Sequence, residues 1–195
     1  MLALLMLLIT IVIEVLTSLY DMIKSAIQVQ EMRNYAYTDG LTGLKNRRAY
    51  VEDLENVSAR DDKDSLIIVA IDLNGLKKVN DELGHAAGDE MINEGGHIIR
   101  DSFAKYGETY RMGGDEFSTL FYGSKEALAE CLKAMQETAA THKGDMVNEI
   151  SISFGYAVWA DHSDKSITEI EKMADADMYH NKSEYYKRTG NDKRR

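Results

Sequence analysis

Three acidic side chains stand where predicted strands end, and together they suggest metal chemistry. Asp72 lies at the carboxyl end of an apolar run, residues 65–73, and Asp115 and Glu116 lie at the turn of a predicted hairpin. Three carboxylates brought together repel one another unless a cation lies between them. Hard oxygen ligands of this kind suit Mg²⁺, which usually binds one or two carboxylates together with substrate phosphates. The pattern therefore predicts a magnesium site that receives a nucleoside triphosphate.

Glycines beside these acids would let a ligand approach the backbone closely. Gly113 and Gly114 have no side chain to exclude a phosphate or sugar, although a Gly-Gly-Asp turn also arises for backbone reasons alone. After the first acid, Gly75 and Leu76 join a strand to a predicted helix, where free backbone N–H groups can bind phosphate. Lys77 either neutralises phosphate charge as the bond changes or is a solvated lysine on an exposed helix face.

The elements that must position these residues alternate between strand-like and helical stretches. The largely apolar run 65–73 is typical of a central strand buried on both faces, and 109–112 and 117–122 are predicted to form the hairpin. A further strand is expected at 149–159. Helices are expected at 47–57, 76–83, 88–106, 125–138 and 166–186. The predicted class is α+β, with a mainly antiparallel central sheet flanked by helices.

The amino-terminal segment, residues 1–33, is predicted to be one long hydrophobic helix. Glu14 is the only charged side chain in the first 20 residues. Extended through Leu19, the apolar run reaches the roughly 20 residues that span a bilayer, at a cost of about 2.5 to 3.5 kcal/mol for the acid. The first cations, Lys24 and Arg33, follow this run and would place the remainder of the chain in the cytoplasm.

A second interpretation of the same segment is a helix that pairs with a copy of itself. Apolar side chains recur along it at spacings of three and four, which is typical of a coiled-coil seam. The seam consists of Ile9, Ile13, Leu16, Tyr20, Ile23 and Ile27. The two interpretations are compatible if the helix continues from a membrane into the cytoplasm, so both are kept.

Composition places the rest of the chain in a reducing, cytosolic setting. The 195 residues include 23 Lys and Arg against 33 Asp and Glu, a formal net charge of −10. This acidic balance disfavours nucleic acid as a partner, because a duplex repels a surface of its own sign. The single cysteine, Cys131, cannot form an intramolecular disulfide, and no Cys/His cluster has the spacing of zinc ligands. The length allows one domain plus a short appendage.

Five separated motifs, in order, are similar to those of the GGDEF-domain diguanylate cyclases. They are DGLTGLKNRR at 39–48, DLNGLKKVND at 72–81, GHAAGD at 84–89, RMGGDEF at 111–117 and ADADMYHNK at 174–182. The resemblance implies a palm-like, nucleotidyl cyclase-type fold for residues 34–195. It also implies condensation of two GTP into cyclic di-GMP with release of pyrophosphate, by two domains that face each other in a homodimer.

The resemblance assigns the acids to a two-metal site. Asp72, the main-chain carbonyl of Leu73, Asp115 and Glu116 occupy the family's metal positions, which imply two Mg²⁺, with Mn²⁺ as an alternative. Two such ions can lower the pKa of the attacking 3′-hydroxyl, align it with the α-phosphate and stabilise the departing pyrophosphate. Asp115 also occupies the position proposed to activate that hydroxyl. We expect Asp115, Glu116 and Lys77 to be the catalytic residues.

The resemblance also assigns residues to the nucleotide. Asn80 and Asp89 match the family's guanine readers, and a carboxylate accepts hydrogen bonds from N1–H and N2–H₂ of guanine but would face the bare N1 of adenine. Asp89 therefore favours GTP over ATP, unless it serves only as an acid that complements a helix dipole. Lys182 matches the family's phosphate lysine on the last helix. The expected substrate-binding set is completed by Gly75, Leu76, Gly113 and Gly114.

Three departures from the family pattern carry further expectations. Tyr185 and Tyr186 stand where the family has a glycine-arginine pair, so the phosphate contact of that arginine is missing. Lys187 or Arg188 would have to replace it. Asn74 stands where the family often has a second aspartate. Many members carry an RxxD motif for inhibition by the product, whereas this chain has AKYG at 104–107, so we expect weak feedback through that surface.

Three functions of different classes follow. The first is an active diguanylate cyclase whose catalytic domain is cytoplasmic, with the first helix as an anchor in the bacterial inner membrane, a coiled coil, or both. The second is a catalytically silent GGDEF-type module that binds GTP and regulates a partner, for which the altered ending around Tyr186 is the hint. The third is a membrane-tethered dimerisation scaffold, which rests on the first helix alone.

Overall fold

The computed structural model describes residues 1–60, 62–162 and 164–190. These residues form two compact units, one of residues 1–37 and one of the described residues from 38 onward. The first unit is the helix α1 (Leu2–Tyr37), which has no buried residue. Its most apolar 18-residue window has a mean hydropathy of 2.6, so the helix is long and apolar enough to cross a membrane. The predicted long amino-terminal helix is confirmed, and it extends beyond residue 33.

The second unit is built around a five-stranded sheet with the order β1-β3-β4-β2-β5. Its strands are β1 (Lys45–Asn46), β2 (Leu66–Leu73), β3 (Gly107–Gly113), β4 (Glu116–Tyr122) and β5 (Ile152–Val158). In the part of the chain that the structure describes, β1 pairs with β3 in parallel, and the other three strand pairs are antiparallel. The predicted α+β class with a mainly antiparallel sheet is confirmed.

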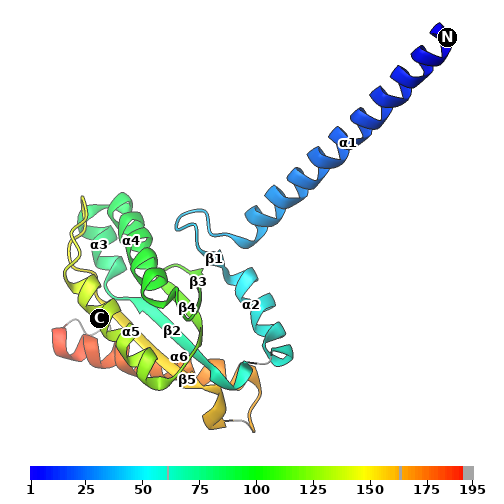
Figure 1. The fold of residues 1–195 in the computed structure, drawn as a ribbon. Coiled ribbons are helices and arrows are strands. Elements are labelled where there is room, and N and C mark those ends of the chain that lie inside the picture. Colours follow the sequence, from blue (N-terminus) through cyan, green and yellow to red (C-terminus); the bar gives the residue numbers. More distant parts are fainter. Residues whose placement is uncertain (61, 163, 191–195) are drawn as a thin grey trace. The chain divides into compact units, whose positions relative to one another are not determined.

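Helices flank this sheet (Figure 1). They are α2 (Arg47–Glu55), α3 (Leu76–Leu83), α4 (His85–Phe103), α5 (Lys125–Ala140) and α6 (Ile167–Thr189), with short 3₁₀ turns at Asn56–Ala59, Lys63–Ser65 and Trp159–His162. Local chemistry sets where two of them begin. The Asn46 side chain accepts from the first N–H groups of α2, and Ser166 and Glu169 form a capping box at α6.

The central strand β2 is buried along its whole length, as its apolar sequence predicts. Because successive side chains point to opposite faces of a strand, Val69, Ile71 and Leu73 share one face. These three join the main hydrophobic core, to which α4 contributes Ile99 and α5 contributes Met135. Asp72 must therefore lie on the opposite face, which is the face that α6 helps to cover.

The first turn of α4 differs from the prediction, which began this helix at Gly88 rather than His85. Gly88 lies within the helix, and Asn80 of α3 packs directly against it. A Cβ atom at Gly88 would lie 2.0 Å from Oδ1 of Asn80. This glycine therefore permits a close contact between two helices and does not mark a helix boundary.

Candidate active site

The end of β2 and the turn between β3 and β4 bring the three predicted acids together. Asp72 is the direct cross-strand partner of Glu116 in the antiparallel β2–β4 ladder, so their side chains share one face of the sheet. The N–H of Leu73 donates to the carbonyl of Asp115 at 3.0 Å. Residues far apart in the sequence thus meet at one edge of the sheet.

The turn that carries Asp115 depends on its two glycines. The β3–β4 pairing shifts register between Arg111 and Gly113, and Gly113 and Gly114 have φ angles of +141° and +56°. Side chains at these positions would strain the backbone, because L-residues rarely adopt positive φ. The backbone explanation for the Gly-Gly pair is therefore correct for the turn itself, and it is compatible with a role in admitting a ligand.

Asp72 is an unusual group to find in a protein interior. The residue is 1% exposed, and its Oδ2 accepts a hydrogen bond from Nζ of Lys182 on α6. Its Oδ1 is buried and has no hydrogen-bond partner among the described residues. Burial raises the pKa of Asp72 to about 6, with a further increase from the charges of Asp115 and Glu116 and an opposing effect from Lys182.

The donor set at this edge fits a divalent ion. Among the described residues, no three side chains of His, Cys, Asp or Glu are arranged to hold an ion by themselves. Mg²⁺ does not require such a cage, because it usually combines one or two carboxylates with substrate phosphates and water. The unpartnered Oδ1 of Asp72 is a buried hard acceptor that an ion could satisfy. Glu116 and Asp115 beside it would supply further oxygens of the same kind.

Lys182 forms an ion pair with one of the three acids, and its predicted phosphate role stays a prediction. Its side chain is 14% exposed, and its ammonium forms an ion pair with Asp72. Burial alone would lower the pKa of Lys182, but the hydrogen bond and charge of Asp72, together with the charge of Asp115, raise it above its usual value. A positive charge therefore lies against Asp72 and close enough to Asp115 to be affected by its charge.

The two predicted guanine readers lie on facing parts of α3 and α4. Asn80 packs against the backbone of Gly88, and Asp89 is the next residue of α4. Asp89 is exposed, as a residue that contacts a nucleotide must be before the ligand binds. The short path from α3 to α4 thus places Asn80 against the residue that precedes Asp89, and their role as guanine readers stays a prediction.

The predicted phosphate turn lies between β2 and α3. Gly75 precedes the first helical residue, Leu76, with a φ of +85°, a left-handed conformation that favours glycine. Its carbonyl accepts from the N–H of Val79 at 3.1 Å, which closes the first turn of α3. Lys77 is exposed on this helix, consistent with either of its two predicted roles.

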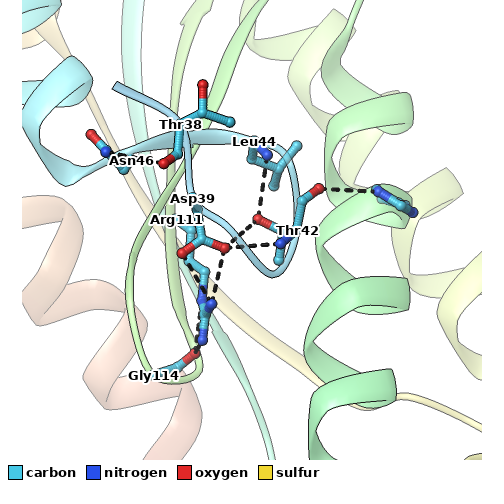
Figure 2. Close-up of polar contacts among 8 residues, drawn as sticks. Thr38, Asp39, Thr42, Leu44, Asn46, Arg111 and Gly114 are labelled. Carbon is cyan, nitrogen blue, oxygen red and sulfur yellow. Dashed lines mark hydrogen bonds and ion pairs between the residues drawn. The ribbon is translucent and has the colours of Figure 1, made fainter. Parts of the chain in front are cut away.

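Arg111 and Asp39 form a partly buried ion pair that the sequence analysis did not assign to the site. Nη1 of Arg111 contacts both carboxylate oxygens of Asp39, at 2.9 and 3.1 Å, and its Nε and Nη2 donate to the carbonyl of Gly114 at 3.2 and 2.9 Å. Figure 2 shows this guanidinium between the 38–46 loop and the glycine turn. Both residues lie inside recognised motifs, at 39–48 and 111–117, and that is the signal that could have identified them.

Further hydrogen bonds hold Asp39 in place. Its Oδ1 accepts from the N–H and the hydroxyl of Thr42, at 2.9 and 2.8 Å, and the carbonyl of Thr42 lies 3.2 Å from Nε2 of His97 on α4 (Figure 2). Burial by itself would raise the pKa of Asp39, but the bonds from Thr42 and Arg111 hold it below its usual value. The loop, the turn and α4 are therefore joined by one charged network.

Comparison with known protein families decides the family. The model described as "Diguanylate cyclase, GGDEF domain" matches residues 36–188. The chain belongs to the GGDEF domain family. This GGDEF chain is 33% identical over 161 residues to a protein named diguanylate cyclase DgcS of Shewanella oneidensis, a match that covers 82% of this chain and 54% of that protein.

Two other similar proteins have names that mention a membrane or a coiled coil. A protein of Staphylococcus haemolyticus named an uncharacterized membrane protein is 34% identical over 151 residues, 73% of this chain and 42% of its own length. The chain thus spans about half the length of the curated relatives that it matches. The crystal structure of the coiled coil and GGDEF domain of DgcB from Caulobacter crescentus, in complex with c-di-GMP, has a TM-score of 0.75 and 26% identity. That match covers 91% of this chain and 94% of the DgcB chain.

Proposed function

We propose that this GGDEF chain is an active diguanylate cyclase, which condenses two GTP into one cyclic di-GMP and two pyrophosphates. The observation that carries the proposal is the buried Oδ1 of Asp72, which has no partner among the described residues. Glu116 is the cross-strand neighbour of Asp72 on the adjacent strand β4, and Asp115 precedes Glu116. A protein that needed only the fold would gain nothing from an unsatisfied buried carboxylate oxygen, which is costly to maintain. An ion-binding role gives that oxygen a partner.

The metal ligands proposed are Asp72, the carbonyl of Leu73, Asp115 and Glu116. Divalent ions, Mg²⁺ or alternatively Mn²⁺, would supply electrostatic stabilisation of the phosphoryl transfer and would lower the pKa of the attacking hydroxyl. The chain's own part would be to hold oxygens at this edge of the sheet, and Asp115 is the proposed acceptor of the proton of the 3′-hydroxyl. Lys182, which pairs with Asp72, would turn to bind the negatively charged triphosphate when it arrives. Exposed Lys77 would neutralise phosphate charge.

Substrate recognition is proposed to rest on α3, α4 and two glycine turns. Asn80, which packs against Gly88, and the next residue, Asp89, would read the guanine edge. Gly75 and Leu76 would offer backbone N–H groups to phosphate, and the β3–β4 turn would let the nucleotide approach closely through Gly113 and Gly114. This arrangement favours GTP over ATP, because a carboxylate cannot accept from N1 of adenine.

A homodimer is proposed because a two-fold symmetric product needs two GTP molecules held face to face. Helix α1 is the proposed means of pairing and of anchoring the protein in the bacterial inner membrane, with the catalytic domain in the cytoplasm. Three observations support this: its length, the mean hydropathy of 2.6 over its most apolar 18-residue window, and the absence of buried residues along it. The name of the staphylococcal relative and the coiled coil of DgcB agree with the two roles.

A catalytically silent GTP-binding module is the second candidate, and a specific observation favours it. The ammonium group of Lys182 already forms an ion pair with one oxygen of Asp72. In addition, Tyr185 and Tyr186 replace the family's glycine-arginine pair. If Lys182 does not release Asp72, the chain could bind the nucleotide without turning it over.

Incubation of the purified full-length protein with GTP and Mg²⁺ tests the proposal. Chromatography of the nucleotides should show cyclic di-GMP and pyrophosphate, and an Asp115→Ala variant should make neither. GTP binding without product would favour the silent module. Neither binding nor product would leave the dimerisation scaffold of the sequence analysis.

A further inference from the structure

The turn after β2 is held from both sides of the strand. On the β4 side, the N–H of Leu73 donates to the Asp115 carbonyl at 3.0 Å, and on the β5 side, the N–H of Asn74 donates to the Ser151 carbonyl at 2.8 Å. The Leu73 carbonyl and the Asn74 N–H belong to one planar trans peptide, so they point in opposite directions. The bond to Ser151 therefore directs the Leu73 carbonyl toward β4, the strand that carries Glu116.

The side chain of Asn74 strengthens this attachment. Asn74 is 5% exposed, its Nδ2 donates to the hydroxyl of Ser151 at 3.1 Å, and its Oδ1 accepts from the hydroxyl of Ser153 at 3.0 Å. Ser153 is itself 6% exposed. These are sheltered, mutually satisfied hydrogen bonds between segments nearly 80 residues apart, and their loss would leave buried polar groups without partners.

Ser153 also faces Asp72. The two are direct partners in the β2–β5 ladder, so their side chains lie on the same face of the sheet. A serine hydroxyl has a single proton to donate, and in this structure it goes to Asn74. Oδ1 of Asp72 is left without a partner among the described residues. Asn74 thus keeps a neighbouring donor away from the oxygen that is proposed to bind the ion.

We propose that Asn74, through Ser151 and Ser153, is a positioning residue for phosphoryl transfer. It aims the Leu73 carbonyl at the metal position, fixes the Gly75 turn, and keeps Oδ1 of Asp72 available. This inference rests on the proposed function and adds to it a residue that the sequence analysis noted only as a departure from the family's second aspartate.

An aspartate at this position would fulfil the same role. Both serine hydroxyls can rotate, so a carboxylate could accept from each of them, whereas a leucine of similar size could bind neither. The positioning role therefore predicts rescue by the acid and not by the apolar side chain. The test compares N74D, N74L and S153A, with T119V as the matched control. Thr119 forms a buried hydroxyl pair with Thr109 in the same sheet, at 3.0 Å, away from this turn.

Amide hydrogen exchange of the nucleotide-free protein is the first readout. In N74L, exchange at residues 73–79 should be at least roughly tenfold faster than in the wild type, and S153A should show a smaller increase. N74D and T119V should exchange like the wild type in this segment. Unchanged exchange in folded N74L would overturn the proposal, and if N74L fails to fold, S153A decides by the same criterion.

Turnover is the second readout. N74L should lower kcat by up to about 100-fold, the order expected when reacting groups are displaced by about 1 Å. N74D should retain most of the activity, and T119V should have wild-type kcat even if it unfolds at a lower temperature. Faster exchange with an unchanged kcat would overturn the positioning role.

Nucleotide affinity separates this proposal from the proposed function. If the wild type makes no cyclic di-GMP, the cyclase assignment fails, but titration with the α,β-methylene analogue of GTP and Mg²⁺ still tests Asn74. Binding to N74L that is about tenfold weaker than to the wild type and N74D would support its role in positioning the phosphate turn. Equal affinities would overturn it.

Discussion

At the residue scale, the site depends on a buried carboxylate that the fold does not fully satisfy. Asp72 has one oxygen on Lys182 and the other without a partner among the described residues. We predict that Asp72→Asn, which keeps the size of the side chain, lowers the rate of cyclic di-GMP synthesis at least about 100-fold through the loss of metal binding. Initial rates with GTP and Mg²⁺ measure this effect.

The matched control for this change is Asp64→Asn. Asp64 is an exposed acid two residues before β2, and its variant should retain full activity because Asp64 lies at the opposite end of the strand from Asp72. Equal rates in both variants would contradict the metal assignment. Thermal unfolding of the Asp72 variant is needed alongside, because this acid is buried and its replacement can also change stability.

At the element scale, the Asp39–Arg111 pair joins the 38–46 loop to the β3–β4 turn. The pKa of Asp39 is lowered in the folded state, so its stabilisation is complete above the unfolded pKa of about 3.9 and is lost as pH falls through the lower folded value. We predict that Asp39→Asn lowers the free energy of unfolding by about 2 kcal/mol at neutral pH. The difference from the wild type should shrink below about pH 4, as denaturant titrations at several pH values would show.

Asp101→Asn is the control for the Asp39 variant. Asp101 pairs with Arg100 at 2.7 Å, but both side chains are largely exposed, and such surface pairs contribute about 0 to 1 kcal/mol. Asp39→Asn should also reduce kcat, because Arg111 then loses the partner that holds it against the Gly114 carbonyl. Equal stability of the two variants at every pH would contradict a structural role for the link.

The order of elements could be predicted from local patterns, but several of their bounds and contacts could not. The buried run 65–73 and the hairpin gave clear signals because apolar periodicity and glycine turns are local properties. Strand β5 begins at Ile152, later than predicted, after Glu149 takes a positive φ of 58°. The two-residue parallel strand β1 left no pattern to detect.

The candidate site was predictable to a similar extent. The meeting of the acids at the ends of β2 and β4 followed from the motifs. The contact of Lys182 with Asp72 and the clamp of Asn74 by Ser153 join residues 110 and 79 positions apart in the chain. Such pairs arise only when the sheet and α6 pack together, so single-sequence patterns do not contain them.

The α4–β3 connection supports another prediction at the element scale. Residues 104–107, AKYG, lack the RxxD motif of product-inhibited relatives and line a cavity of about 500 Å³ with Arg60 and Tyr122. We predict that added cyclic di-GMP leaves the initial rate nearly unchanged through this surface. Rate measurements over a product titration test this, and tight inhibition with the product bound near Ala104 would contradict it.

At the scale of the whole molecule, the proposed reaction is limited by how often two catalytic domains meet. Residues 38–195 form a compact unit with its own hydrophobic core, while α1 buries none of its side chains within one chain. Pairing through α1 would raise the local concentration of the second domain without altering either active site. The helix should therefore govern activity through the dimer population and not through the chemistry.

Deletion of residues 1–30 tests this division of roles. We predict that the truncated chain keeps its thermal unfolding temperature but loses specific activity at low protein concentration, and that the activity returns as concentration rises, since dimerisation follows mass action. Assays over a wide range of enzyme concentration, with sedimentation to measure the dimer, give the comparison. Fusion of the truncated chain to an unrelated parallel two-stranded coiled coil should restore activity at low concentration. Undiminished turnover of the unfused, monomeric chain would show that α1 is not the means of pairing.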